Sequence, residues 1–149
     1  MLKENTLNRA LYKALQASGM KLQNYGTVLA TIADKDKEEA LPLIRRFYKL
    51  GFNIEATNGT ARFLKANGIR THALTKISDG SEEIPNALRQ GHIAYVINTR
   101  DPGANQSDGA QIRQIATEYN VTMFTALDTV RVLLDVLEET TLTISTIDA

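Results

Sequence analysis

Apolar positions follow two different periods along the chain, and their alternation predicts strands separated by helices. Short apolar runs rich in β-branched residues occupy residues 26–33, 52–56, 69–74, 92–98 and 121–124, as expected of buried strands. Helical spacing is found in residues 37–50, 60–67, 82–90 and 111–119, with a last helix from Asp128. Strands joined by helices pair in parallel through crossover connections. The pattern predicts an α/β domain with a five-stranded parallel sheet and helices on both faces.

Several boundary residues sharpen this prediction. Asp36 is expected to cap the helix at 37–50, although Pro42 fits poorly inside that helix. The sequence TNGT at 57–60 predicts a turn, and Ser107 or Asp108 is expected to cap the helix at 111–119. The tail from Thr140 is rich in β-branched residues, which favours β structure there.

The first 24 residues differ from the remainder. Residues 3–18 have one narrow apolar stripe on a polar segment, which predicts an amphipathic helix that ends at Gly19. Residues 1–24 carry a charge of +3, because their four basic residues outnumber Glu4. We therefore divide the chain into a helix with its connector at 1–24 and a globular domain at 25–149. The helix either packs on that domain or belongs to the edge of a preceding one.

Composition excludes several classes of function. Seventeen basic residues balance seventeen acidic ones, so a general electrostatic grip on nucleic acid or an acidic membrane is not expected. The absence of Cys excludes disulfides, a thiolate nucleophile and a sulfur-based zinc site, and two His residues exclude a His-rich metal centre. No apolar stretch approaches the ~20 residues of a membrane-spanning helix, and the N-terminus does not resemble a signal peptide. These features predict a cytoplasmic protein without nucleic-acid or membrane partners.

Polar residues follow the predicted strands, and in a parallel sheet ligands bind beyond the carboxyl ends of the strands. Backbone N–H groups at a helix start, Thr hydroxyls and Lys side chains together make an oxyanion site. Gly59 would let a ligand approach the backbone closely. The candidate site residues are Lys37, Thr57, Gly59, Thr60, Lys76, Asn98, Thr99 and Arg100.

Each of these features also has an ordinary explanation. The run Asp34–Lys37 is typical of a solvated, self-paired surface segment, and Lys76 of a surface lysine. Asn98 and Thr99 fit loop residues that cap the backbone. What favours a site is that all of them converge on one edge of the sheet. His72 and His92 are expected to be structural or solvated, and the pair Asp101 and Asp108 lacks the fixed spacing of catalytic carboxylates.

The ordered segments NRALYKALQASGMKL, GTVLATIADKDK, GFNIEATNGTARFL, LTKISDG, YVINTRDP and SDGAQIRQIA resemble the carboxyl-terminal end of the carbamoyl-phosphate synthase large chain. The resemblance spans essentially the whole chain. It implies a regulatory domain of the methylglyoxal-synthase-like fold, a Rossmann-like three-layer arrangement, with residues 1–24 at the edge of the preceding synthetase domain. The parent enzyme makes carbamoyl phosphate for pyrimidine and arginine biosynthesis with ATP and Mg or Mn. This domain itself would hold no cofactor or metal and no catalytic residue.

The resemblance also implies ligands and partners. Such domains bind phosphorylated effectors such as uridine or inosine monophosphate, or N-acetylglutamate in urea-cycle forms. The family's anion-site residues fall on Lys37, Thr57, Thr60, Lys76 and Asn98. Arg100 replaces a Thr of the nucleotide-binding pattern, which favours a more negative ligand such as phosphoribosyl pyrophosphate unless Arg100 turns outward to the loop carboxylates. Expected partners are the synthetase domains, the small glutaminase subunit and other copies of the chain.

Two relatives of this fold are enzymes, so three hypotheses stay open. Methylglyoxal synthase removes phosphate from dihydroxyacetone phosphate with a carboxylate base in a Gly-Gly-Asp loop and nearby histidines. Here Ser81 occupies the position of that base, and Asp34-Lys35 stands where the enzyme has His-Asp. The second relative, an inosinate cyclohydrolase, has a segment that contains Lys and His, and this chain lacks that segment.

The leading hypothesis is an allosteric effector-binding domain. The alternatives are a free-standing lyase of the methylglyoxal-synthase type, or a structural or oligomerisation module with a vestigial pocket, for which the last helix and tail, with a charge of −4, offer a docking surface.

Overall fold

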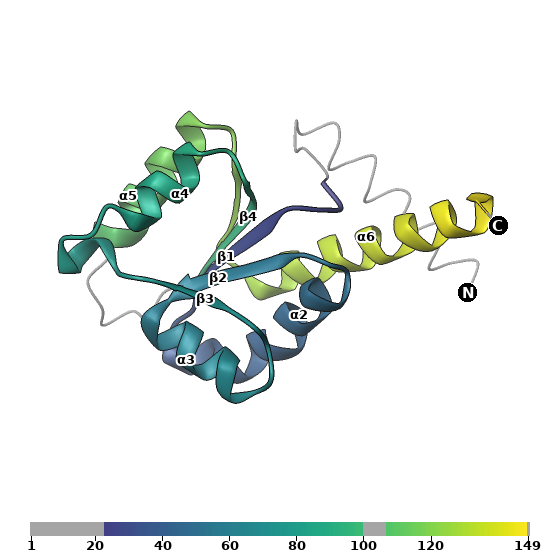
Figure 1. Cartoon of the computed structure of the whole chain (residues 1–149), viewed down its shortest axis with the longest axis horizontal. Coiled ribbons are helices and arrows are strands. Elements are labelled where there is room, and N and C mark those ends of the chain that lie inside the picture. The colour runs from purple at the N-terminus through teal and green to yellow at the C-terminus, as the bar shows by residue number, and fades with distance from the viewer. Residues whose placement is uncertain (1–22, 100–106, 149) are drawn as a thin grey trace.

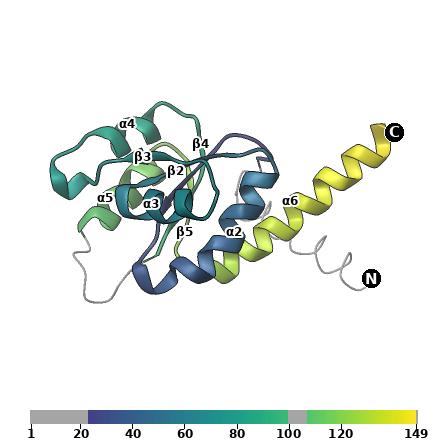
Figure 2. The ribbon, with the colours of Figure 1, turned by 60° about the horizontal axis from the view of Figure 1, so that its bottom comes forward.

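The computed structural model describes residues 23–99 and 107–148, and Figures 1 and 2 show its three layers. The predicted helix at 3–18 and the candidate residue Arg100 lie outside these residues. The strands are β1 (Thr27–Thr31), β2 (Asn53–Thr57), β3 (His72–Leu74), β4 (Ile93–Asn98) and β5 (Thr122–Phe124). They form one sheet in the order β3-β2-β1-β4-β5, and every neighbouring pair is parallel. The predicted five-stranded parallel sheet is confirmed.

Helices cover both faces of this sheet, as predicted. One face packs against α2 (Lys37–Lys49), α3 (Asn58–Ala66) and α6 (Leu127–Asp148). The other packs against α4 (Glu83–Arg89) and α5 (Ser107–Glu118). Two short 3-10 helices, η1 (Asp34–Asp36) and η2 (Ile77–Asp79), follow β1 and β3. Every residue of β4 is buried, because apolar side chains contact both layers of helices. None of the described helices is long and apolar enough to cross a membrane.

The largest departure from the sequence prediction is the C-terminal tail. The expected β structure from Thr140 is wrong, because α6 continues without a break to Asp148 (Figure 2). A stripe of Val130, Leu133, Leu134 and Leu137 buries the first turns of this helix against the sheet. The Thr140 hydroxyl donates to the Val136 carbonyl at 2.9 Å, so a β-branched residue is accommodated within the helix. Continuation of a packed helix therefore overrides the local β propensity.

Three smaller predictions at element boundaries are also wrong. TNGT is not a separate turn, because Thr57 ends β2 and Asn58 begins α3. Asp36 occupies the N-cap position of α2 but makes no capping hydrogen bond with its side chain, since η1 holds its backbone in a helical conformation. The carboxylate of Asp108 accepts the Ser78 N–H at 3.2 Å instead of capping its own helix. Pro42 does lie inside α2, with its side chain exposed.

Candidate functional site

The first turn of α3 lies directly after β2 at the carboxyl edge of the sheet, so its free N–H groups face the region beyond the strands. Lys37 on α2 reaches this turn. A Cβ placed on Gly59 would lie 3.7 Å from the Lys37 Nζ atom. A helix start combined with an ammonium group this close is a favourable environment for an anion.

Two lysines act on the carboxylate of Asp34 beside this turn. Lys37 forms an ion pair with Asp34, which is largely exposed. The hydrogen bond from Lys37 and its charge, and more weakly the charge of Lys76, hold the pKa of Asp34 below its usual range. Lys76 is therefore close to the same pair, although its own side chain is exposed. The prediction of a self-paired run at 34–37 is consistent with these contacts, and Lys76 supplies additional positive charge.

The hydroxyls of Thr57 and Thr60 are buried beneath this turn. The Thr60 hydroxyl oxygen accepts the Ile32 N–H at 3.2 Å and lies 3.4 Å from the Thr57 hydroxyl oxygen. Thr60 thereby ties the end of β1 to the start of α3. Its replacement by Ala would leave a buried N–H without a partner, so Thr60 is a structural residue as well as a candidate ligand.

The end of β4 completes the arrangement on the other side of β1. The Thr99 hydroxyl oxygen accepts the Ala33 N–H at 2.8 Å, and the Thr31 hydroxyl donates to the Asn98 Oδ1 atom at 2.6 Å. The side chain of Asn98 is only 6% exposed, and its Nδ2 group has no hydrogen-bond partner among the described residues. A buried amide donor left without a partner costs free energy, so an acceptor that reached this group would stabilise this edge of the sheet.

The structure thus joins most of the predicted site residues through the end of β1. Successive N–H groups of Ile32 and Ala33 bond to Thr60 on one side and to Thr99 on the other. Lys37, Thr57, Gly59 and Thr60 lie around the start of α3, Lys76 contributes charge beside them, and Asn98 and Thr99 end β4. The placement of Arg100 stays untested.

Asp108 is a residue that sequence reasoning set aside as an exposed loop carboxylate. It is half-buried in the first turn of α5, where its Oδ2 atom binds the Ser78 N–H. Its Oδ1 atom is buried and has no hydrogen-bond partner within the described ranges. Since Ser78 follows Lys76 in η2, this acceptor belongs to the same edge of the sheet. No periodicity signals such a residue, because its burial depends on the packing of α5 against η2.

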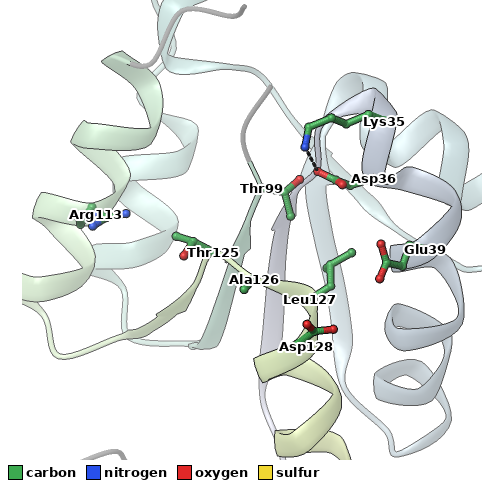
Figure 3. Close-up of a pocket in the computed structure, with 9 residues that line it drawn as sticks. All are labelled: Lys35, Asp36, Glu39, Thr99, Arg113, Thr125, Ala126, Leu127 and Asp128. Atoms are coloured by element: carbon green, nitrogen blue, oxygen red, sulfur yellow. Dashed lines mark ion pairs between the residues drawn. The ribbon is translucent and has the colours of Figure 1, made fainter. Parts of the chain in front are cut away.

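A pocket of about 450 Å³ lies on the β5 side of Thr99 (Figure 3). Arg113 of α5 faces it from one side, and Asp36 and Glu39 face it from the other. The remaining lining residues are Lys35, Thr99, Thr125, Ala126, Leu127 and Asp128. Lys35 and Asp36 form an ion pair of 3.6 Å at its rim. Of the predicted site residues that the structure describes, only Thr99 lines this pocket, so the pocket adjoins the described part of the anion site.

The two histidines lie away from this edge. His92 precedes β4 and lies 3.0 Å from the Glu55 carboxylate, while His72 begins β3 with an exposed side chain. Both are thus solvated or paired, as expected. Within residues 23–99 and 107–148, no group of His, Asp and Glu is arranged to hold a metal ion.

The comparison with known families agrees with this architecture. The family model of the MGS-like domain matches residues 39–125, which include β2 to β5 and most of the candidate site. The chain belongs to the MGS-like domain family. A crystal structure of methylglyoxal synthase from Elizabethkingia anophelis NUHP1 aligns with this MGS-like domain at a TM-score of 0.63 and 18% identity. The alignment covers 76% of this chain and 79% of the methylglyoxal synthase chain, which shows that the two share a fold.

Proposed function

We propose that this MGS-like domain binds a phosphorylated small molecule at the carboxyl edge of its sheet. The observation that carries the proposal is the Lys37 ammonium group beside Gly59 at the start of α3. Among the described residues, the Asn98 Nδ2 group and the Asp108 Oδ1 atom have no hydrogen-bond partner, so they offer a further donor and an acceptor. A phosphate ester presents both kinds of group, because its phosphate oxygens accept hydrogen bonds and the hydroxyls of its organic part donate them.

More specifically, we propose that this domain binds such a ligand in order to regulate a carbamoyl-phosphate synthase large chain. Support comes from the ordered sequence segments that resemble that chain, including YVINTRDP and GFNIEATNGTARFL. The ligand would be an effector that binds one arrangement of the domain better and so shifts the synthetase toward that state. The synthetase domains with ATP and Mg or Mn, the glutaminase subunit and the cytoplasmic location belong to this proposal.

A thermal-shift panel tests the site. Uridine, inosine and guanosine monophosphates, phosphoribosyl pyrophosphate, ornithine and N-acetylglutamate are compared with inorganic phosphate. A ligand at 100 times its Kd stabilises the fold by about 2.7 kcal/mol, or roughly 5 to 10 °C in Tm. Lys37→Met is expected to abolish most of the shift. The matched control is Lys65→Met, which removes an exposed lysine from the opposite end of α3. Equal shifts in both variants would move the site elsewhere.

The second candidate is a lyase of the methylglyoxal-synthase type. It is favoured by the structural likeness to methylglyoxal synthase and by the Asp108 Oδ1 atom, which has no hydrogen-bond partner in the part of the chain that the structure describes. Against it, Ser81 occupies the position expected of the catalytic base, and its hydroxyl accepts the Glu83 N–H at 3.1 Å. A hydroxyl has little basicity near neutral pH. We expect no turnover of dihydroxyacetone phosphate. Methylglyoxal production that disappears in Asp108→Asn would favour the lyase over the effector domain.

A further inference from the structure

The segment that enters the domain is held to β4 by one buried phenol. Tyr95 is fully buried in a cluster of rings with Phe47, Phe52 and Phe124. Its hydroxyl donates to the Gln23 carbonyl at 2.7 Å and accepts the Gln23 N–H at 2.7 Å. Both backbone polar groups of Gln23 are thereby satisfied by one side chain. Gln23 is not part of the sheet, and the hydroxyl supplies the two hydrogen bonds that a neighbouring strand would otherwise make.

A β-bulge positions this side chain. The pairing of β1 with β4 runs from Thr27 opposite Ile93 to Val28 opposite Tyr95, so Ala94 is the additional residue. A bulge redirects the side chains next to it. Ala94 and Tyr95 consequently both pack toward α2 and α6, whereas Ile93 packs toward α4.

Gly26 forms a second contact between the entering segment and the bulge. It has a φ of +118°, and a Cβ at this position would lie 3.2 Å from the Ala94 Cβ atom. A side chain would be strained at this φ and in unusually tight contact with Ala94, so Gly is favoured where the chain passes this close to β4. Residues 23–26 are thus attached to the bulge at two points.

The same strand ends at the candidate site. Three residues after Tyr95, the Nδ2 group of Asn98 has no hydrogen-bond partner within residues 23–99 and 107–148, and the Thr99 hydroxyl accepts the Ala33 N–H just beyond β1. We propose that Tyr95 is a positioning residue that links occupancy of the strand-end site to the segment entering the domain at Gln23. The inference rests on the proposed ligand site. A ligand that accepts a hydrogen bond from Asn98 would shift the end of β4. Because Tyr95 lies on the same strand, this shift would alter its hydrogen bonds to Gln23.

Hydrogen exchange measured by mass spectrometry on the 149-residue chain tests this link. Tyr95→Phe keeps the ring but removes the hydroxyl, and it should speed exchange of the Gln23 amide about tenfold. Saturating uridine monophosphate should change Gln23 exchange in the wild type at least threefold, and this response should vanish in Tyr95→Phe while the Kd stays within about twofold. The matched control is Thr71→Val, which removes another buried hydroxyl that donates to a backbone carbonyl but keeps the response.

Two results would overturn the link. One is wild-type Gln23 exchange that does not respond to bound nucleotide, and the other is a full response in Tyr95→Phe. If uridine monophosphate causes no thermal shift, the proposed function fails for that ligand, and the link is tested without it. Asn98→Ala should then change Gln23 exchange in the wild type but not in the Tyr95→Phe background. Thr31→Val replaces it if Asn98→Ala does not fold, since Thr31 donates to Asn98. Equal changes in both backgrounds would contradict the proposal.

Discussion

At the scale of single residues, a substitution at Gly59 can change ligand binding without lowering the stability of the fold. Its φ lies outside the left-handed region, and an added Cβ would meet only the Lys37 Nζ atom, at an ordinary contact distance of 3.7 Å. Nothing in the fold therefore requires Gly at this position. Its absence of a side chain matters only to a group that approaches the first turn of α3.

We expect Gly59→Ala to leave the fold intact and to weaken the binding of phosphate esters. Alanine is favoured over glycine in a helix by up to about 1 kcal/mol, so the free energy of unfolding should stay level or rise. The added methyl group would occupy the space in front of Lys37, and Kd should rise about tenfold or more. Urea denaturation and calorimetric titration measure the two effects. A variant that binds as tightly as the wild type would place the anion away from this turn.

Tyr95 predicts a dependence of stability on alkaline pH. Burial raises the pKa of its phenol to about 12, opposed in part by the Gln23 backbone hydrogen bond, whereas a tyrosine in an unfolded chain titrates near 10. Between about pH 10 and 12 the unfolded chain binds fewer protons than the folded one, so the free energy of unfolding falls as pH rises. Its contribution is fully present below pH 10.

Denaturation curves measured at several pH values should show that the free energy of unfolding falls more steeply with pH in the wild type than in Tyr95→Phe, which has no phenol at this position. Tyr119→Phe is the control, because Tyr119 is 44% exposed and its loss should keep the wild-type slope. Identical slopes for wild type and Tyr95→Phe would show that the phenolate forms without unfolding.

At the scale of elements, α2 and α6 are joined by one guanidinium group. Arg46 donates from Nε and Nη2 to the Glu138 carboxylate at 2.8 and 3.0 Å, and from Nη2 to Asp135 at 2.7 Å. These hydrogen bonds, partly offset by desolvation, raise the pKa of Arg46 further above its usual value. Part of the acidic face of the last helix, which the sequence offered as a docking surface, is therefore used within the domain.

We expect Arg46→Met to lower the free energy of unfolding by about 1 kcal/mol, since the carboxylates are half-exposed and solvent screens the interaction. Arg46→Lys should restore only part of the loss, because an ammonium group cannot form the two parallel hydrogen bonds. Urea denaturation at low and high salt measures both, with the exposed Arg62→Met on α3 as control. Full restoration by Lys would mean that charge alone holds the two helices.

At the scale of the whole molecule, the net charge is zero, but the charged residues are not evenly distributed over the surface. The seventeen basic and seventeen acidic residues cancel, yet Lys37 and Lys76 both lie close enough to Asp34, at the carboxyl edge, to lower its pKa. Salt should therefore act on ligand binding much more than on folding. Exposed charges are screened beyond about 10 Å at 0.1 M salt and beyond about 3 Å at 1 M.

We expect the Kd of a phosphate ester to rise at least threefold between about 0.1 and 1 M sodium chloride, while the unliganded Tm changes little. Calorimetric titration and thermal melts at both salt concentrations check this. Lys76→Met should show a weaker salt dependence than the wild type, and the exposed Lys65→Met should match the wild type. A Kd independent of salt would exclude a charged ligand group at these lysines.

The sequence by itself determined the sheet, its parallel pairing and most of the candidate site. Short apolar runs and helical periods reflect which faces are buried, and burial of both faces of a strand requires helices on each side. The edge where Lys37, Thr57, Gly59, Thr60, Asn98 and Thr99 gather follows from parallel pairing, since all strands then end on one side.

Other features depended on tertiary structure alone. Residues of α6 up to Glu138 pack on the sheet and on α2, and the helix that they establish continues past Thr140, where the local sequence favours a strand. The hydrogen bond between Ser78 and Asp108, the Arg46 contacts and the hydrogen bonds between Tyr95 and Gln23 join residues 30 to 92 positions apart, and no local period predicts such pairs. Local pattern reports which side of an element is buried, whereas the partner that each polar group meets is set by how distant elements pack together.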